Sequence, residues 1–325
     1  MGASTRMATA DRASWTACSG CGLCVLACPV WHETRDVMMT PHGRCKSLQG
    51  GASLSDIADS VLACVMCGSC EAVCPEEIDT IGLARRLRVE LAEAGLSPLA
   101  RREAGRTRTE TAGATVAARR VFLAGTLGER PDLLATIADH LMRHGGVVKG
   151  PDIVTASRRW EAGVADAARL LDRALARMPR ATSYVVADGA THRMLRERAP
   201  RARVAGLGET LLRSKPVRRA LSPGDLYVLE PRAYHGDHTR LAPFYERLRQ
   251  ETGCQLNLDL QRLAISTGRG LQDELGIPNL DWKAQIRWML QGRAFSRVIV
   301  EDLGDLAPFA EVTGGPVVHV GELLP

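Results

Sequence analysis

Apolar residues recur at two different periods along this chain, and the change of period divides it. Residues 79–94 are apolar at every third or fourth position, which predicts an amphipathic helix that ends at Gly95. A shorter helix is predicted within residues 53–63, where Ser53 and Asp56 occupy capping-box-like positions. From Arg119 onward, short β-branched runs alternate with longer amphipathic segments. The first part is therefore expected to be helical and the second to contain layers of strands and helices.

The second part repeats one order of predicted elements. We expect strands at 121–124, 184–187, 226–230, 255–260, 298–301 and 317–320. We expect helices at 131–144, 159–178, 241–251 and 281–291. Strands that alternate with helices usually pair in parallel. Because the order recurs, residues 119–325 are predicted to be a duplicated α/β domain with halves of about 119–222 and 223–325.

Two segments lack any regular period. Residues 1–15 are small and polar, and we expect them to be disordered. Residues 97–118 mix Pro, Gly, Thr and Arg, which is typical of a linker. The predicted fold class is therefore α+β multidomain, with an α-helical domain at 16–96, a basic linker at 97–118 and the duplicated α/β domain, whose strands are mostly parallel, at 119–325.

Two copies of one cysteine run lie in the helical part. CSGCGLCVLACP starts at Cys18 and CVMCGSCEAVCP starts at Cys64, and together they hold eight of the ten cysteines. The spacing C-x2-C-x2-C-x3-C-P is typical of ferredoxins with [4Fe–4S] clusters, and in two-cluster ferredoxins the fourth cysteine binds the cluster of the other run. We therefore predict two [4Fe–4S] clusters with exchanged ligands. The first is expected on Cys18, Cys21, Cys24 and Cys74, and the second on Cys64, Cys67, Cys70 and Cys28.

Three other uses of these cysteines fit the pattern less well. A zinc site needs four ligands and has no use for a third evenly spaced cysteine in each run. A disulfide framework requires an oxidising compartment, and a redox dithiol needs only one C-x2-C pair. The remaining cysteines, Cys45 and Cys254, are interpreted as buried packing residues.

Charge and hydropathy add two expectations. No stretch approaches 18 unbroken apolar residues, and the N-terminus lacks an apolar signal-peptide segment, so we expect a cytoplasmic protein. The net charge is +5, and residues 85–120 hold nine arginines and four glutamates, which account for all of this excess. Aromatic residues make up only 4% of the chain, which argues against a nucleic-acid interface. The basic segment is interpreted as a solvated helix and linker, and docking onto an acidic partner is the alternative.

The two runs and the intervening TPHGR (40–44) resemble the iron–sulfur subunits of glycolate oxidase and lactate utilisation systems, and of heterodisulfide reductase. Relatives carry a similar S-P-R-G-R between their runs. The resemblance implies that the C-terminal part is a duplicated cysteine-rich domain, in which CCG motifs bind a special cluster or perform disulfide chemistry. The first half shows a departure, because VTASRRWEAG (154–163) stands where its CCG motif would fall and Thr191 stands at a cysteine position.

The second half departs in the same way. Arg232 replaces the cysteine of a D-P-C-like segment, and Ser266 and Thr267 replace the cysteine pair of C-C-G-x-G-G. Hydroxyl groups cannot replace soft thiolates as iron ligands, so we expect no cluster and no disulfide reduction in this domain.

These observations favour an electron-transfer subunit over an enzyme that acts by itself. The resemblance implies partners, namely a flavin-containing oxidoreductase subunit and a further iron–sulfur subunit, with any membrane association made through a partner. No catalytic residue is predicted. The alternative is a redox enzyme whose α/β domain keeps a substrate site built from Arg232, His235, Asp237 or His238.

Overall fold

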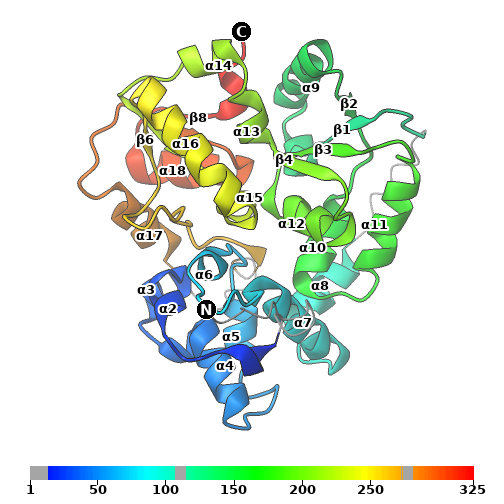
Figure 1. Cartoon of the computed structure of the whole chain (residues 1–325), viewed down its shortest axis with the longest axis vertical. Coiled ribbons are helices and arrows are strands. Elements are labelled where there is room, and N and C mark those ends of the chain that lie inside the picture. Colours follow the sequence, from blue (N-terminus) through cyan, green and yellow to red (C-terminus); the bar gives the residue numbers. More distant parts are fainter. Residues whose placement is uncertain (1–13, 107–114, 272, 274–280) are drawn as a thin grey trace, which may run out of the picture. The chain divides into compact units, whose positions relative to one another are not determined.

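The computed structural model of the chain describes residues 14–106, 115–271, 273 and 281–325. Its contacts divide the chain into two compact units (Figure 1). Unit 1 consists of Met1–Gly105, Glu161–Val164 and Gly268–Asp281, and unit 2 consists of the remaining residues. The expected disorder of residues 1–15 falls mostly on residues 1–13, which lie outside the described part of the chain. The predicted mixture of helices and parallel strands is confirmed.

Unit 1 is helical in its described part. Its α-helices are α2 (Leu23–Leu26), α3 (Pro29–Thr34), α4 (Pro41–Gln49), α5 (Ala58–Ala63), α6 (Ser69–Ala72), α7 (Thr80–Glu93) and α8 (Pro98–Gly105). Two short 3-10 helices are η1 (Trp15–Ala17) and η2 (Val37–Met39). The side chain of Asp79 accepts a hydrogen bond from the Gly82 N–H at the start of α7, and the helix stops before Gly95.

The core of unit 1 forms along the apolar face of α7. The face predicted from the sequence is buried, and Leu91 at its end is fully inaccessible to solvent. Cys45 packs in the same core, as expected. The segment predicted as a linker differs in its first part, because α8 buries Leu99 and Ala100 there. Residues 107–114 of that segment lie outside the described part.

Unit 2 contains two parallel four-stranded sheets of the same order. The first sheet has the order β2 (Val148–Lys149), β1 (Arg120–Leu123), β3 (Ser183–Val186), β4 (Arg203–Gly206). The second has the order β6 (Gln255–Leu256), β5 (Asp225–Val228), β7 (Arg297–Val300), β8 (Val317–His319). In register, Val121 pairs with Tyr184 in the first sheet and Leu226 pairs with Val298 in the second. The four strands of each sheet therefore follow the same order relative to their order along the chain, and the duplication itself stays a prediction.

Helices follow the strands of unit 2, as Figure 1 shows. They are α9 (Pro131–Gly145), α10 (Val154–Ala162), α11 (Ala167–Ala176), α12 (Gly189–Arg198), α13 (Leu207–Leu211), α14 (Lys215–Arg219), α15 (Pro231–Gly236), α16 (His238–Thr252), α17 (Trp282–Leu290) and α18 (Leu306–Thr313). The prediction of one helix over 159–178 is wrong, because α10 ends before Gly163 and α11 starts at Ala167. Gly163 has a φ of +80°, a conformation that ends a helix readily only at glycine.

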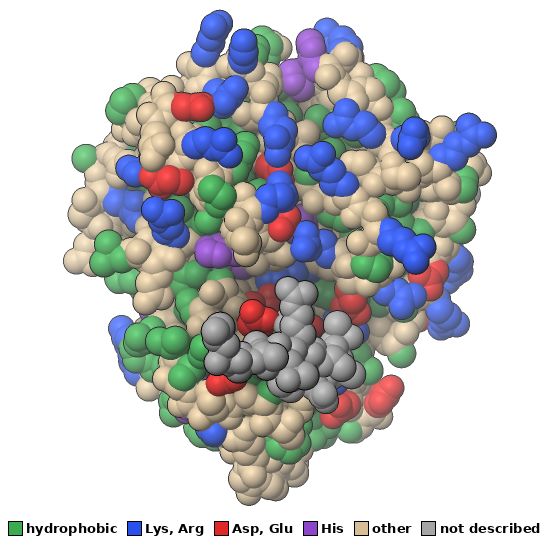
Figure 2. Space-filling model, in the orientation of Figure 1, with side chains coloured by type: hydrophobic (Ala, Val, Ile, Leu, Met, Phe, Trp, Pro, Cys, Tyr) green, Lys and Arg blue, Asp and Glu red, His purple; other side chains and the backbone are tan. Residues whose placement is uncertain are grey.

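Across the described residues, no helix combines the length and the apolar character that crossing a bilayer requires. The basic side chains of unit 2 are spread over the face drawn in Figure 2, with acidic side chains among them.

Candidate functional site

The two cysteine runs adopt matching backbone conformations in unit 1. Gly22 and Gly68 both have positive φ angles and lie at the N-termini of the short helices α2 and α6. Gly20 has a φ of +87°, and Met66 adopts the same left-handed region at the equivalent position of the second run. Each run therefore turns in the same way around its first three cysteines.

The first group of thiols lies near the surface. Cys21 is exposed, whereas Cys18, Cys24 and Cys74 are half-buried. Burial raises the pKa of Cys24 to about 11, and neighbouring thiols add to the rise. Those neighbours are Cys18, Cys74 and Cys21. The structure thus brings the last cysteine of the second run to the first three cysteines of the first run.

The second group of thiols is buried. One cavity is lined by Cys28, Cys64, Cys67 and Cys70 together with mostly apolar residues. Burial raises the pKa of Cys28 to about 12, with Cys67 as the thiol that contributes most. Each of these four side chains is at most 9% exposed. Here the last cysteine of the first run joins three cysteines of the second.

Hydroxyl groups lie against the sulfur atoms of the buried group. The Oγ1 atom of Thr80 is 2.8 Å from the Sγ atom of Cys70, and the Oγ atom of Ser69 is 3.3 Å from that of Cys67. A hydroxyl can donate to a thiolate, and such bonds are one means by which proteins adjust the potential of a cluster. Ser69 lies inside the second run, but nothing in the sequence pattern marks Thr80.

Arg44 is the only charged residue among those that line this cavity in the described structure. It is 3% exposed, and its Nη1 atom donates to the carbonyl oxygen of Ser60 at 2.7 Å. The sequence pattern placed Arg44 in the TPHGR segment but gave it no role. The buried Cys45 lies beside Cys18 of the other group, where burial raises its pKa to about 12.

The thiols fit an iron–sulfur cluster on chemical grounds. Crowded, buried thiols hold their protons because thiolates lose hydration and repel each other, and coordination to iron ions removes both penalties. None of the ten cysteines forms a disulfide. Among the residues that the structure describes, no three Cys, His, Asp or Glu side chains converge on one metal ion. The ligand assignment itself stays a prediction.

The residues of the alternative substrate site have internal partners in unit 2. His235 is buried, and its Nε2 atom accepts from the N–H of Ala264 at 3.1 Å. Asp237 bonds to Arg240, whereas the Nε2 atom of His238 lies 3.3 Å from the carbonyl oxygen of Arg262. These contacts give the three side chains structural roles.

Hydroxyls at the proposed lost-cysteine positions are also bonded within unit 2. The Oγ1 atom of Thr191 donates to the Oδ2 atom of Asp188 at 3.0 Å. The Oγ1 atom of Thr267 donates to the Oδ1 atom of Asp305 at 3.2 Å, and Ser266 is buried beside it. The hydrogen bonds hold these hydroxyls inside the protein core.

Three carboxyl groups in unit 2, of which Glu230 and Glu301 are buried and Asp188 is half-buried, were missed by the sequence analysis. Asp188, Glu230 and Glu301 follow β3, β5 and β7, and the carboxyl ends of parallel strands are where α/β folds commonly bind ligands. Each accepts internal hydrogen bonds, as when the Oε1 atom of Glu301 accepts from the hydroxyls of Tyr227 and Tyr245. The sequence feature that could have identified them is an acidic residue at or directly after the end of each of these predicted strands.

Glu230 leads to a pH-dependent prediction. Burial raises its pKa to about 8, well above the value of about 4.3 in an unfolded chain. Between these values the folded state keeps a proton that the unfolded state has lost, so this group lowers the stability of unit 2 as pH rises, by at most about 1.4 kcal/mol per pH unit. Glu230→Gln keeps an oxygen that can accept from the N–H of Ala233 and does not titrate.

We expect the thermal midpoint of Glu230→Gln, measured relative to that of the parent protein, to increase from pH 5 to pH 8. Circular dichroism melts of both proteins across this range measure the difference. A difference that stays constant with pH would contradict the assigned environment of Glu230.

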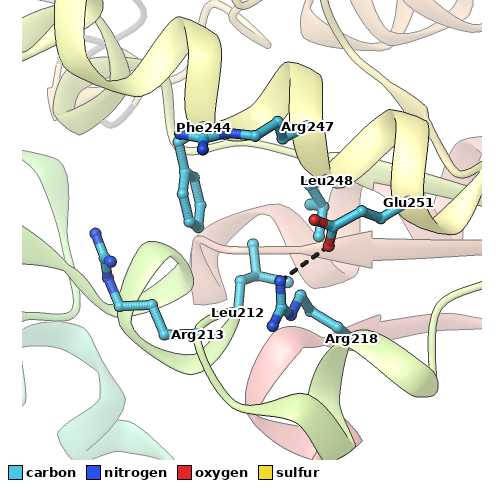
Figure 3. A pocket seen from close by; sticks show the side chains of 7 residues that line it. All are labelled: Leu212, Arg213, Arg218, Phe244, Arg247, Leu248 and Glu251. Carbon is cyan, nitrogen blue, oxygen red and sulfur yellow. Dashed lines mark hydrogen bonds and ion pairs between the residues drawn. The ribbon is translucent and has the colours of Figure 1, made fainter.

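A hollow on the surface of unit 2 holds three arginines (Figure 3). Arg218 pairs with Glu251 at 2.9 Å, and Arg213 lies 5.3 Å from the ring centroid of Phe244 and pairs with Glu209. The remaining lining residues are Leu212, Arg247 and Leu248. Two of the three arginine charges are therefore balanced by glutamates of the same unit.

The comparisons with known proteins bear on unit 1. The family model described as a 4Fe-4S dicluster domain matches residues 14–78, which contain all eight cysteines of the two runs. Comparisons with curated proteins and with solved structures give no match. The match supports an iron–sulfur protein with 4Fe–4S cluster binding in this segment. Such a domain suggests a role in electron transfer.

Proposed function

We propose that this iron–sulfur protein is an electron-transfer subunit with two [4Fe–4S] clusters. It would relay electrons between a flavin-containing dehydrogenase or reductase subunit and another redox carrier. The observation that carries the proposal is the buried cavity lined by four thiols, because these come from both cysteine runs. The second set of four supports the count of two clusters.

The thiols of the two groups would hold the clusters, and the clusters supply reversible one-electron chemistry. Clusters held by these thiols would supply one-electron transfer alone, in which no bond in a substrate is made or broken. The chain's own contribution is to fix the thiolates, to exclude water from the second site and to aim Thr80 and Ser69 at its sulfur atoms.

Unit 2 would serve as the docking platform for the partner subunits. The resemblance to glycolate oxidase, lactate utilisation and heterodisulfide reductase subunits supports this role, as do the hydrogen-bonded Thr191 and Thr267 at the positions of the missing cysteines. A flavoprotein and a further iron–sulfur subunit are the proposed partners. The proposed location is the cytoplasm, with a membrane reached only through a partner.

Anaerobic purification of the native complex tests the proposal. We expect about eight iron and eight sulfide ions per chain, two reducible clusters and a copurifying flavin-containing subunit. When cysteines of the two runs are replaced by alanine, Cys254→Ala is the control, because this residue packs in the core of unit 2. Purified protein that contains zinc in place of iron, or about four irons or fewer, would rule out two [4Fe–4S] clusters.

A further inference from the structure

Arg44 is held rigidly beside the buried thiols. It belongs to α4, and its guanidinium donates to both the carbonyl oxygen and the Oγ atom of Ser60, at 2.7 and 3.3 Å. The hydroxyl of Ser60 in turn donates to the carbonyl oxygen of Met38 at 2.7 Å. Because the orienting group is itself anchored, the position of the positive charge is fixed relative to the cavity.

No carboxylate in the described part of the chain pairs with Arg44. The ionisable side chains that act most strongly on the Arg44 guanidinium are those of Cys64, Cys28 and Cys70, which become negative when they lose their protons. A buried guanidinium without a negative partner is costly, and arginine keeps its proton under all ordinary conditions. The negative partner that this site offers is the set of cluster thiolates.

The first group of thiols has a different electrostatic environment. Lys46 reaches it from the same helix, with its Nζ atom 3.3 Å from the carbonyl oxygen of Cys18, but Lys46 is exposed. Water and salt screen an exposed charge much more than a buried one. The two sites should therefore differ in how strongly a neighbouring positive charge acts on them.

We propose that Arg44 sets the reduction potential of the cluster held by Cys28, Cys64, Cys67 and Cys70, and raises it above the value that burial alone would give. This inference rests on the proposed function. Burying a cluster with four thiolates disfavours a further electron, because the added negative charge loses hydration. The fixed guanidinium offsets that penalty at this cluster and leaves the exposed cluster nearly unaffected.

The test is an anaerobic redox titration of the full chain monitored by electron paramagnetic resonance. A Cys24→Ala background removes the exposed cluster, so the remaining signal belongs to the buried one. In Arg44→Met, we expect the ratio of reduced to oxidised buried cluster at a fixed ambient potential to fall at least about tenfold, which is about 59 mV for a one-electron couple. Arg44→Lys should restore most of the loss, and Lys46→Met should leave this cluster unchanged.

A second neutral variant separates charge from packing. Arg44→Gln keeps an amide that can donate to Ser60, and it should shift the potential in the same direction as Arg44→Met. The proposal is overturned if a neutral variant with full iron content keeps the reduction potential of the parent protein. It is also overturned if, in protein that keeps Cys24 and both clusters, a neutral variant shifts the potentials of the two clusters equally. Loss of iron from Arg44→Lys as well as from both neutral variants also overturns it, because Arg44 would then be structural only.

Loss of the buried cluster from both neutral variants but not from Arg44→Lys supports the proposal, since Arg44→Gln keeps a donor group and Arg44→Lys keeps the charge. The failure of the proposed function is recognised separately. It would appear in the unaltered protein as a missing second cluster, before any substitution at Arg44 is compared.

Discussion

Replacing Cys74 by alanine is expected to remove the exposed cluster and to leave the buried one intact, although Cys74 belongs to the second cysteine run. Iron content should fall from about eight to about four per chain. The physical reason is that Cys74 lies among the thiols of the first run, near Cys24, and not in the cavity with Cys64. Iron analysis and electron paramagnetic resonance measure the loss.

Double replacements distinguish exchanged ligands from ligands confined to one run. With exchanged ligands, Cys18→Ala combined with Cys74→Ala damages one cluster and leaves about four irons, whereas Cys64→Ala combined with Cys74→Ala damages both. If the ligands were confined to each run, the first double variant would damage both clusters and the second would damage only one. Cys254→Ala should retain full iron content, since this residue is buried in unit 2.

The groupings of cysteines were more predictable from the sequence than their surroundings. A C-x2-C-x2-C spacing fixes three thiols within one turn of chain, so local geometry alone defines most of each group. Arg44 and Thr80 come from other segments, and their places beside the buried thiols depend on how α4 and α7 pack. A linear pattern cannot show packing of this kind.

The fold shows a similar division. Runs of apolar and β-branched residues located β1, β3, β5, β7 and β8 to within a residue or two. The first four are mostly buried, whereas the edge strand β8 is mostly half-buried. The two-residue strand β2 and the strand β4 were missed, and QLNLDL forms only β6 (Gln255–Leu256). The strand ends there because the side chain of Asn257 bonds to the N–H of Leu229 and to the carbonyl oxygen of Ile265.

The break between α10 and α11 has its cause in a contact distant in sequence. A Cβ atom on Gly163 would lie 2.5 Å from the carbonyl carbon of Arg88, so the chain passes too close to α7 for any other residue. The guanidinium of Arg88 meets the same segment, with its Nη1 atom donating to the carbonyl oxygen of Glu161 at 2.8 Å. The apolar pattern of residues 159–178 does not reveal this contact.

Arg88 is expected to be the most sensitive residue of unit 1 outside the cysteine runs. It is fully buried, and besides Glu161 it donates to the carbonyl oxygens of Val61, Leu62 and Cys64. These carbonyls lie at the end of α5 and at the start of the second cysteine run. Arg88→Met would leave buried carbonyl groups without donors, at about 1–3 kcal/mol for each group that water cannot reach.

We expect Arg88→Met to lower the thermal midpoint of unit 1 and to lose the buried cluster before the exposed one, because Arg88 anchors the backbone of Cys64, a proposed ligand of the buried cluster. Arg86→Met is the matched control, since it removes an exposed arginine from the same helix. Thermal melts and iron content of the two variants should differ clearly. Equal stability and equal iron content would mean that the carbonyl oxygens of Val61, Leu62 and Cys64 find other donors, and that Arg88 does not hold the second cysteine run in place.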